Sequence, residues 1–242
     1  MCGIFGFSGN SKIKDSELQL IKNLLILSES RGKEACGLAI DGNSEIKYLK
    51  APIPASDLIN TPNFNLQISN AIESDFKTVI GHSRLVTNGY EQDNNNNQPV
   101  VKNGIVAIHN GIIVNDKELW DIVGRESKKS ELDTELIPTL IHHNLKTEKN
   151  IIASVQKMYS QIEGIANIAL LFEGKEELIL ATNNGSLYYV SNEDDSMFIF
   201  SSERHILNEI TQKFKNLRFE SNSIKHLKPN TILVVNNKMR KS

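Results

Sequence analysis

The first seven residues, MCGIFGF (1–7), place a cysteine directly after the initiator methionine and follow it with glycine and apolar residues. The start of a chain is usually frayed and solvated, and a reactive thiol there is a liability. Two interpretations fit this stretch. In the first, Cys2 is a small apolar residue that opens a buried strand, since free cysteine packs well in cores. In the second, Met1 is removed and Cys2 becomes residue one of the mature chain.

The second interpretation has a chemical consequence. A thiol needs a base to become a good nucleophile, and an α-amine has an unperturbed pKa of about 8. A mature chain that starts at Cys2 would therefore carry the nucleophile and its proton acceptor on one residue. The first seven residues do not decide between the two interpretations.

Composition excludes several classes of protein. The chain has 242 residues and a formal net charge of -2, so it is long enough for one large or two small domains and has no charge that favours nucleic acid or an anionic membrane. Its two cysteines make neither a disulfide framework nor a metal site, and they indicate a reducing compartment. No apolar run approaches the roughly 20 residues of a membrane span, and there is no secretory signal. We therefore expect a cytoplasmic protein.

The periodicity of apolar residues predicts an α+β protein. The predicted strands outnumber the helices and follow one another at hairpin intervals in the second half, which favours layers over a doubly wound parallel sheet. Strands are expected at 2–8, 38–40, 78–83, 105–109, 165–172, 178–181, 187–190, 197–200 and 232–235, and helices after an Asp15 cap and at 116–123, 133–143, 151–161 and 203–213. No linker divides the chain, so residues 2–242 are expected to form a single domain.

The polar stretch 89–98 contains four consecutive asparagines, Asn94 to Asn97. Such a stretch is either an ordinary solvated loop or a flap beside a site, with Gly89 at a hinge-like position. Composition alone favours the solvated loop.

Three further motifs allow a structural and a chemical interpretation. In GHSRLVTNG (81–89), Arg84 ends a predicted strand, where arginine is most often a surface ion-pair member but can also bind a carboxylate bidentately. In AIHNGIIVN (107–115), Asn110-Gly111 is a strong hairpin-turn signal, but the Asn110 amide and the Gly111 N–H could instead form an oxyanion hole. In SELDTELI (130–137), Asp133 is expected to cap a helix, or to hold a substrate ammonium.

Taken in order, MCGIFGF, SRGKEACGLA, GHSRLVTNG, HNGIIVN and ELDTELI resemble the class II glutamine amidotransferases, which are N-terminal-nucleophile hydrolases with a cysteine. The chain looks most similar to the glutaminase domain of glutamine–fructose-6-phosphate aminotransferase, from Cys2 to about Glu203. The resemblance implies the four-layer αββα sandwich of that family, in a single type-2 domain over residues 2–242, with Met1 removed.

The resemblance also implies roles for individual residues. Cys2 would be the nucleophile, with its α-amine as the base, and Asn110 and Gly111 would stabilise the oxyanion. Arg84 would bind the glutamine α-carboxylate, and Asp133 would bind the α-ammonium. Two residues of the turn after Arg84, Thr87 and Asn88, would assist it, while Arg31 and Gly32 of the second motif would border the nucleophile and shape the site.

The implied reaction is the glutaminase half-reaction: a γ-glutamyl thioester forms on Cys2, ammonia leaves, and water releases glutamate. The ammonia would pass to a separate synthase subunit or to a C-terminal acceptor domain, in amino-sugar or related biosynthesis, and no cofactor or metal is implied. Where the family has tryptophan and histidine, this chain has Leu85 and Asn88, which bears on ammonia gating. The alternatives are a non-catalytic or glutamine-sensing module that docks to a partner and, with less support, hydrolysis of a different amide.

Overall fold

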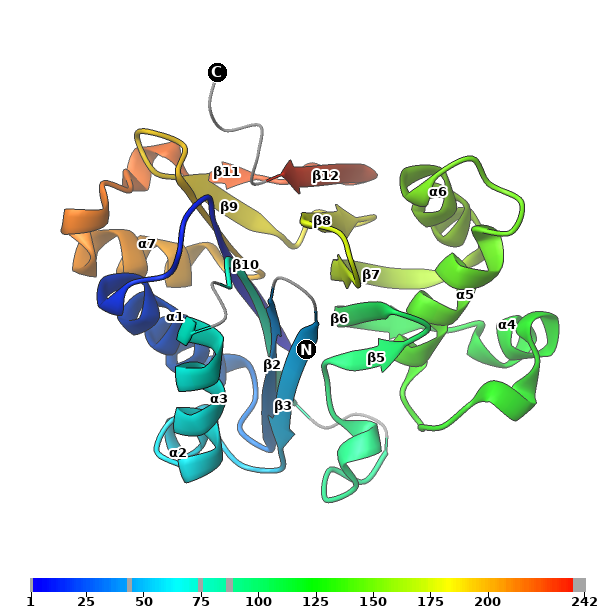
Figure 1. The fold of residues 1–242 in the computed structure, drawn as a ribbon. Helices are drawn as coiled ribbons and strands as arrows, with labels where there is room; N and C mark the ends of the chain where they lie inside the picture. Colours follow the sequence, from blue (N-terminus) through cyan, green and yellow to red (C-terminus); the bar gives the residue numbers. More distant parts are fainter. Residues whose placement is uncertain (1, 43–44, 74–75, 86–88, 237–242) are drawn as a thin grey trace.

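Two β-sheets lie face to face between two layers of helices in the computed structural model, which describes residues 2–42, 45–73, 76–85 and 89–236 (Figure 1). Helices α1, α2, α3 and α7 cover the outer face of one sheet, and α4, α5 and α6 cover the outer face of the other. The predicted αββα sandwich of the α+β class is therefore confirmed.

The first sheet has seven strands, in the order β11-β9-β10-β1-β4-β2-β3, and every neighbouring pair is antiparallel. Its central strand β1 is buried along its whole length, because the second sheet covers one of its faces and helices cover the other. The strands are β1 (Gly3–Gly9), β2 (Ala35–Asp41), β3 (Ile46–Ala51), β4 (Thr78–Arg84), β9 (Tyr188–Ser191), β10 (Met197–Ser201) and β11 (Lys225–His226).

The second sheet has five antiparallel strands, in the order β12-β8-β7-β6-β5. They are β5 (Val100–Lys102), β6 (Ile105–Ile113), β7 (Gly164–Phe172), β8 (Glu177–Thr182) and β12 (Thr231–Asn236). The α-helices are α1 (Asp15–Ser28), α2 (Ala55–Leu58), α3 (Pro62–Glu73), α4 (Asp116–Val123), α5 (Leu136–Asn144), α6 (Ile151–Gln161) and α7 (Arg204–Lys213). No helix in these described ranges is long and apolar enough to span a membrane.

Alternation along β1 divides the core into layers. Phe5 and Phe7 pack outward against α1 and α7, whereas Ile4 packs inward between the sheets with Ile80 of β4 and Ile108 of β6. Successive side chains of a strand point to opposite faces. Residues an even number of positions from Ile4 on β1 therefore face the space between the sheets, including those at the strand end.

The elements predicted from periodicity are all present, with boundaries that differ by a few residues. The expected cap at Asp15 is wrong: Lys14 precedes the helix, and its N–H donates to the Glu17 carboxylate at 3.1 Å. Among the α-helices and strands of the described residues, five were not predicted, namely β3, α2, α3, β5 and β11. Four of these have six or fewer residues, and the fifth, α3, is rich in asparagine, which has a low helix propensity.

Candidate active site

Strand register brings Cys2 and Arg84 to one edge of the first sheet. Gly3, the first residue of β1, lies opposite Ser83, so Cys2 lies just outside β1 beside Arg84, the last residue of β4. Ala35 begins β2 opposite Arg84 on the other side. Three segments far apart in the sequence therefore converge where β4 ends.

The alternation of β1 and β4 directs these side chains toward the second sheet. Cys2 and Arg84 have the same strand parity as the inward-facing Ile4 and Ile80. Strand β6 packs across β1 and β4, and Asn110 has the same parity as its inward-facing Ile108. The space between the two sheets is therefore lined by polar side chains at this end of the sandwich, namely those of Cys2, Arg84 and Asn110.

The Cys2 thiol is partly buried and donates a weak hydrogen bond to the carbonyl oxygen of Leu85, at 3.6 Å. Burial raises the pKa of this thiol. Among smaller effects, the charge of Arg84 lowers that pKa and the charge of Asp133 raises it, so both charges lie within electrostatic range of the sulfur. A buried thiol of this kind requires a base before it can act as a nucleophile.

Arg84 is buried, so the interpretation as a surface residue is wrong. Its side chain is 3% exposed; Nη1 donates to Asn97 Oδ1 at 2.7 Å, and Nη2 donates to the Gly89 carbonyl at 3.0 Å. Burial lowers the pKa of Arg84, with nearby acidic groups opposing the shift. The guanidinium is therefore fixed at the edge of the sheet, beside Cys2.

Arg31 and Gly32 lie in the turn that follows α1. A Cβ at position 32 would be 2.1 Å from the Arg84 carbonyl oxygen, so only glycine allows the turn to approach the end of β4 this closely. Arg31 forms a 3.0 Å ion pair with Glu203, at the start of α7. The predicted pair of site-bordering residues thus packs against the strand end that carries Arg84.

Asn110 and Gly111 do not form a hairpin turn. They lie within β6, opposite Asn167 and Ala166 of β7, and the strand continues to Ile113. Nine paired residues of the β6–β7 ladder override the local turn preference. Asn110 is buried, and its Oδ1 has no hydrogen-bond partner among the described residues.

Asp133 faces the end of the same strand. Its Oδ2 accepts a hydrogen bond from the backbone N–H of Ile113, and its Oδ1 accepts from Thr134, both at 2.8 Å. It starts a short 3-10 turn (Asp133–Glu135) before α5, and no side-chain cap bond is present there. The expected N-cap role is therefore wrong, since the carboxylate binds β6 and its own neighbour instead.

Two histidines near the site lie on different faces. His82 of β4 is fully buried, burial lowers its pKa to about 3, and neither ring nitrogen has a hydrogen-bond partner in the described part of the chain. His109 of β6 points to the helical side, with Nδ1 3.3 Å from Thr134 Oγ1 and Nε2 3.2 Å from the Ile165 carbonyl. Thr87 and Asn88, which were also predicted as site residues, lie outside the described residues.

Comparison with known proteins agrees with this arrangement. A family model described as "Glutamine amidotransferase domain" matches residues 82–209. The chain belongs to this family. The resemblance inferred from the ordered motifs is thereby confirmed.

Several proteins named glutamine–fructose-6-phosphate aminotransferase [isomerizing] are similar to this amidotransferase domain. That of Clostridium acetobutylicum is 33% identical over 211 residues (86% of this chain and 33% of the relative). That of Mesorhizobium japonicum is 30% identical over 204 residues (83% of this chain and 32% of the relative). The chain thus spans about a third of the length of these relatives.

A solved structure supports the fold. Glutamine phosphoribosylpyrophosphate amidotransferase of B. subtilis has a TM-score of 0.73 at 20% identity, covering 97% of this chain and 47% of the solved chain. At this identity the similarity concerns the fold.

The loop 89–98 of the amidotransferase domain is exposed over residues 92–95 but packed at its end, so the expectation of an ordinary solvated loop is wrong for residues 96–98. Asn96, Asn97 and Gln98 are each at most 5% exposed. Gln98 Oε1 accepts from the His109 N–H at 2.6 Å and its Nε2 donates to the His109 carbonyl at 3.1 Å, while Asn96 Oδ1 accepts from the Glu131 N–H at 2.8 Å. The amide side chains are buried because distant backbone groups satisfy them.

Three residues of this network were not identified from the sequence: Lys50, Asn97 and Gln98. The run of asparagines marked the loop, but nothing local indicates which amides are buried, because their partners lie on strands 11 to 47 residues away.

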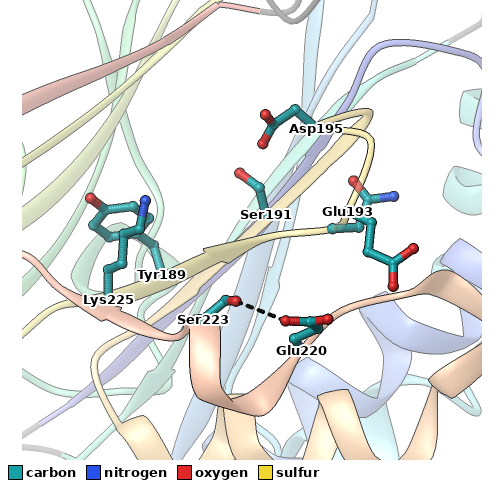
Figure 2. A pocket seen from close by; sticks show the side chains of 8 residues that line it. Tyr189, Ser191, Glu193, Asp195, Glu220, Ser223 and Lys225 are labelled. Carbon is teal, nitrogen blue, oxygen red and sulfur yellow. Dashed lines mark hydrogen bonds between the residues drawn. The ribbon is translucent and has the colours of Figure 1, made fainter.

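A separate hollow of about 310 Å³ lies beside β9 (Figure 2). Acidic side chains from Glu193, Asp195 and Glu220 surround it, with Lys225 opposite, and Ser223 Oγ donates to Glu220 at 3.3 Å. It extends toward the Ser191 end of β9, whereas Cys2 lies at the other end of the first sheet. None of the predicted site residues lines this hollow.

Proposed function

We propose that this domain hydrolyses the side-chain amide of L-glutamine, and that residues 2–242 form a single type-2 amidotransferase domain from which Met1 is removed. The supporting observation is the placement of two opposite charges: Arg84 ends β4 beside Cys2, and the Asp133 carboxylate is bonded to Ile113 at the end of β6, the strand that carries Asn110 and Gly111. Both charges act on the Cys2 thiol. Glutamine carries a carboxylate and an ammonium on its α-carbon, so a cation and an anion set apart beside a thiol form a complementary pair.

In this mechanism Arg84 binds the α-carboxylate and Asp133 binds the α-ammonium. Arg84 is already oriented by Asn97 and Gly89, and the Asp133 carboxylate by Ile113 and Thr134. A carboxylate has about four lone-pair sites, so those two backbone bonds leave capacity for an ammonium. Binding then requires little reorganisation of either side chain.

The chemical step starts when the α-amine of Cys2 accepts the thiol proton. The thiolate attacks the amide carbon, and the carbonyl oxygen becomes an oxyanion that the Asn110 amide and the Gly111 N–H stabilise. The tetrahedral intermediate collapses as the nitrogen takes the proton from the α-ammonium of Cys2 and leaves as ammonia, with a thioester left on Cys2 and its α-amine neutral again. Water then attacks the thioester, which releases glutamate and restores the thiol.

The ammonia is expected to pass to an acceptor. Ammonia is protonated in water, so release beside a docked synthase subunit or a linked domain preserves its reactivity. The related aminotransferases are named for fructose 6-phosphate, so a sugar phosphate is the acceptor that we propose, as part of amino-sugar biosynthesis.

A mass measurement joined to a glutaminase assay tests this proposal. The intact protein is weighed to establish loss of Met1, and glutamate release from L-glutamine is then followed. A diazoketone analogue of glutamine should alkylate Cys2 with loss of N2, add the mass of one analogue less N2, and abolish turnover. The chain has one other cysteine, Cys36, which is 1% exposed, so Cys36→Ala is a matched control that should still be labelled and active.

Cys2→Ala should lose both labelling and turnover while it retains the wild-type circular dichroism spectrum. Turnover that survives in Cys2→Ala would contradict the mechanism. A chain that starts at Cys2 yet neither turns over nor takes up the analogue would instead favour a glutamine-sensing module.

A further inference from the structure

Lys50, on the first sheet, forms hydrogen bonds with the segment 97–99, which includes Asn97, an acceptor of the Arg84 guanidinium. Lys50 belongs to the edge strand β3, and its Nζ donates to the carbonyl oxygens of Asn97 at 2.8 Å and of Pro99 at 3.3 Å. Asn97 and Pro99 immediately precede β5, an edge strand of the second sheet. The Lys50 ammonium therefore links β3 of the first sheet to the segment that leads into β5 of the second sheet.

The packing beneath this contact is close. Gly37 of β2 lies opposite Lys50 in the ladder, and a Cβ at position 37 would be 2.3 Å from the Gln98 carbonyl oxygen and 2.8 Å from Lys50 Cβ. Glycine thus leaves the space in which the Lys50 stem and the Gln98 backbone lie together. The contact is built into the β2–β3 pair and is not an incidental surface bond.

Asn97 connects this contact to the proposed substrate site. Its backbone carbonyl accepts from Lys50, while its side-chain Oδ1 accepts from Arg84 Nη1 at 2.7 Å. The Nδ2 of the same side chain donates to the Glu91 carbonyl at 2.7 Å and to Asn94 Oδ1 at 3.1 Å, which fixes the amide plane. Displacement of Asn97 would therefore move an acceptor of the guanidinium.

The charged groups around Lys50 are consistent with a role for this lysine in holding the segment 97–99 in place. Burial lowers the pKa of Lys50 to about 8, while the carboxylates of Asp93 and Glu135 oppose that shift. Lys102 and Lys129 line the same cavity of about 410 Å³, and Lys102 is paired to Glu135 at 2.7 Å. Bonds from a charged donor to carbonyls are stronger than bonds between neutral groups.

We propose that Lys50 is a positioning residue that acts through Asn97 to hold the Arg84 guanidinium in the orientation that receives the α-carboxylate of the substrate. This inference rests on the proposed role of Arg84 in binding glutamine. In the described part of the chain Lys50 Nζ donates to the Asn97 and Pro99 carbonyls and has no bond to Cys2, and this proposal gives it no contact with the substrate. Its loss affects the carboxylate contact and leaves the nucleophile and the Asn110–Gly111 strand in place.

The test compares two substrates in wild type and Lys50→Met. L-Glutamine carries the α-carboxylate, whereas L-glutamine α-amide lacks that charge and keeps the side-chain amide. Loss of an oriented charged hydrogen bond is expected to raise KM for glutamine about 10-fold, with kcat within about 2-fold of wild type. KM for the α-amide should change less than about 2-fold. A general structural defect would change both substrates alike.

Two further variants sharpen the test. Lys47→Met removes another lysine of β3 for which no role is proposed, and it should match wild type on both substrates. Asn97→Ala removes the Arg84 partner and keeps the carbonyl that Lys50 binds, so it should reproduce the selective rise in KM. If Lys50→Met does not fold, Asn97→Ala still tests the step between Asn97 and Arg84, and an unchanged KM for glutamine in that variant overturns the proposal.

The outcomes separate this inference from the proposed function. The proposed function fails if wild type does not hydrolyse L-glutamine and Cys2→Ala does not bind it in calorimetry. This inference then fails with it. If wild type turns over glutamine but Lys50→Met and Asn97→Ala leave its KM unchanged, or change both substrates equally, only the positioning role of Lys50 is overturned.

Discussion

The Asp133 carboxylate accepts a hydrogen bond from the backbone N–H of Ile113 at 2.8 Å, across a sequence separation of 20 residues. This bond ties the segment before α5 to the last residue of β6, the strand that carries Asn110 and Gly111. The orientation of the carboxylate is thus set by the sheet and does not depend on a bound molecule.

Asp133→Asn should weaken glutamine binding. The substitution removes the charge that would face the α-ammonium, and KM is expected to rise about 10- to 100-fold, with a smaller change in kcat. Steady-state kinetics measures this split. Asp195→Asn, in the hollow of Figure 2 at the other end of the sheet, is the matched control and should behave as wild type. Equal kinetics for the two variants would exclude Asp133 from the site.

Asn110→Ala should slow the chemical step. If its amide donates to the oxyanion, kcat should fall by about 10² to 10³ with little change in KM. Stability should change little by comparison, because Oδ1 has no hydrogen-bond partner among the described residues that could be lost. The check is kcat together with the thermal midpoint, and Asn63→Ala on the exposed side of α3 is the control. A variant with full kcat would remove Asn110 from the mechanism.

His82 should make the fold sensitive to acid. Burial lowers its pKa to about 3, so as pH falls below about 6.5 the unfolded chain takes up this proton before the folded one. The free energy of unfolding should therefore decrease toward low pH, and this contribution is about 2 kcal/mol at pH 5. His82→Leu lacks it, so chemical denaturation at pH 7 and pH 5 should show the variant losing less stability than wild type. Parallel losses would refute the assignment.

Asp41 should make the opposite contribution. Burial raises its pKa to about 7, with Glu176 adding to the shift and Lys77 opposing it. The folded carboxyl binds its proton more tightly than the unfolded one, so stability decreases as pH rises from about 4 to 7. Asp41→Asn should gain on the order of 1 kcal/mol relative to wild type at pH 8, after allowance for solvent screening, and nothing at pH 4. Glu209→Gln, an exposed carboxylate on α7, should show no such pH-dependent gain.

Much of the fold follows from local patterns. The buried strand after Cys2 and the helices with a clear apolar face could be predicted because burial imposes a period of 2 or 3.6 on the sequence. The layered α+β architecture then follows from the order of strands and helices. The site residues were located mainly by their similarity to an amidotransferase family, since each motif alone favoured a structural role.

The errors at the site share a physical cause, which is long-range pairing. Asn110-Gly111 has a strong local turn signal, but pairing with β7 makes it part of a strand. Asn97 belongs to a run that composition assigns to solvent, but Lys50 and Arg84 provide partners that bury it. Asp133 precedes a helix and should cap it, but the free N–H of Ile113 competes for its carboxylate. Such partners become neighbours only in the folded chain.

The paired bonds between the Gln98 side chain and the His109 backbone have a consequence for association between molecules. Strand β5 pairs with β6 only as far as Ala107, which would leave the N–H and carbonyl of His109 open at a sheet edge. Open edges accept extended peptides and promote aggregation. Because the Gln98 amide occupies both groups, it completes the ladder as a further strand residue would, and it blocks β-augmentation of this edge by another chain.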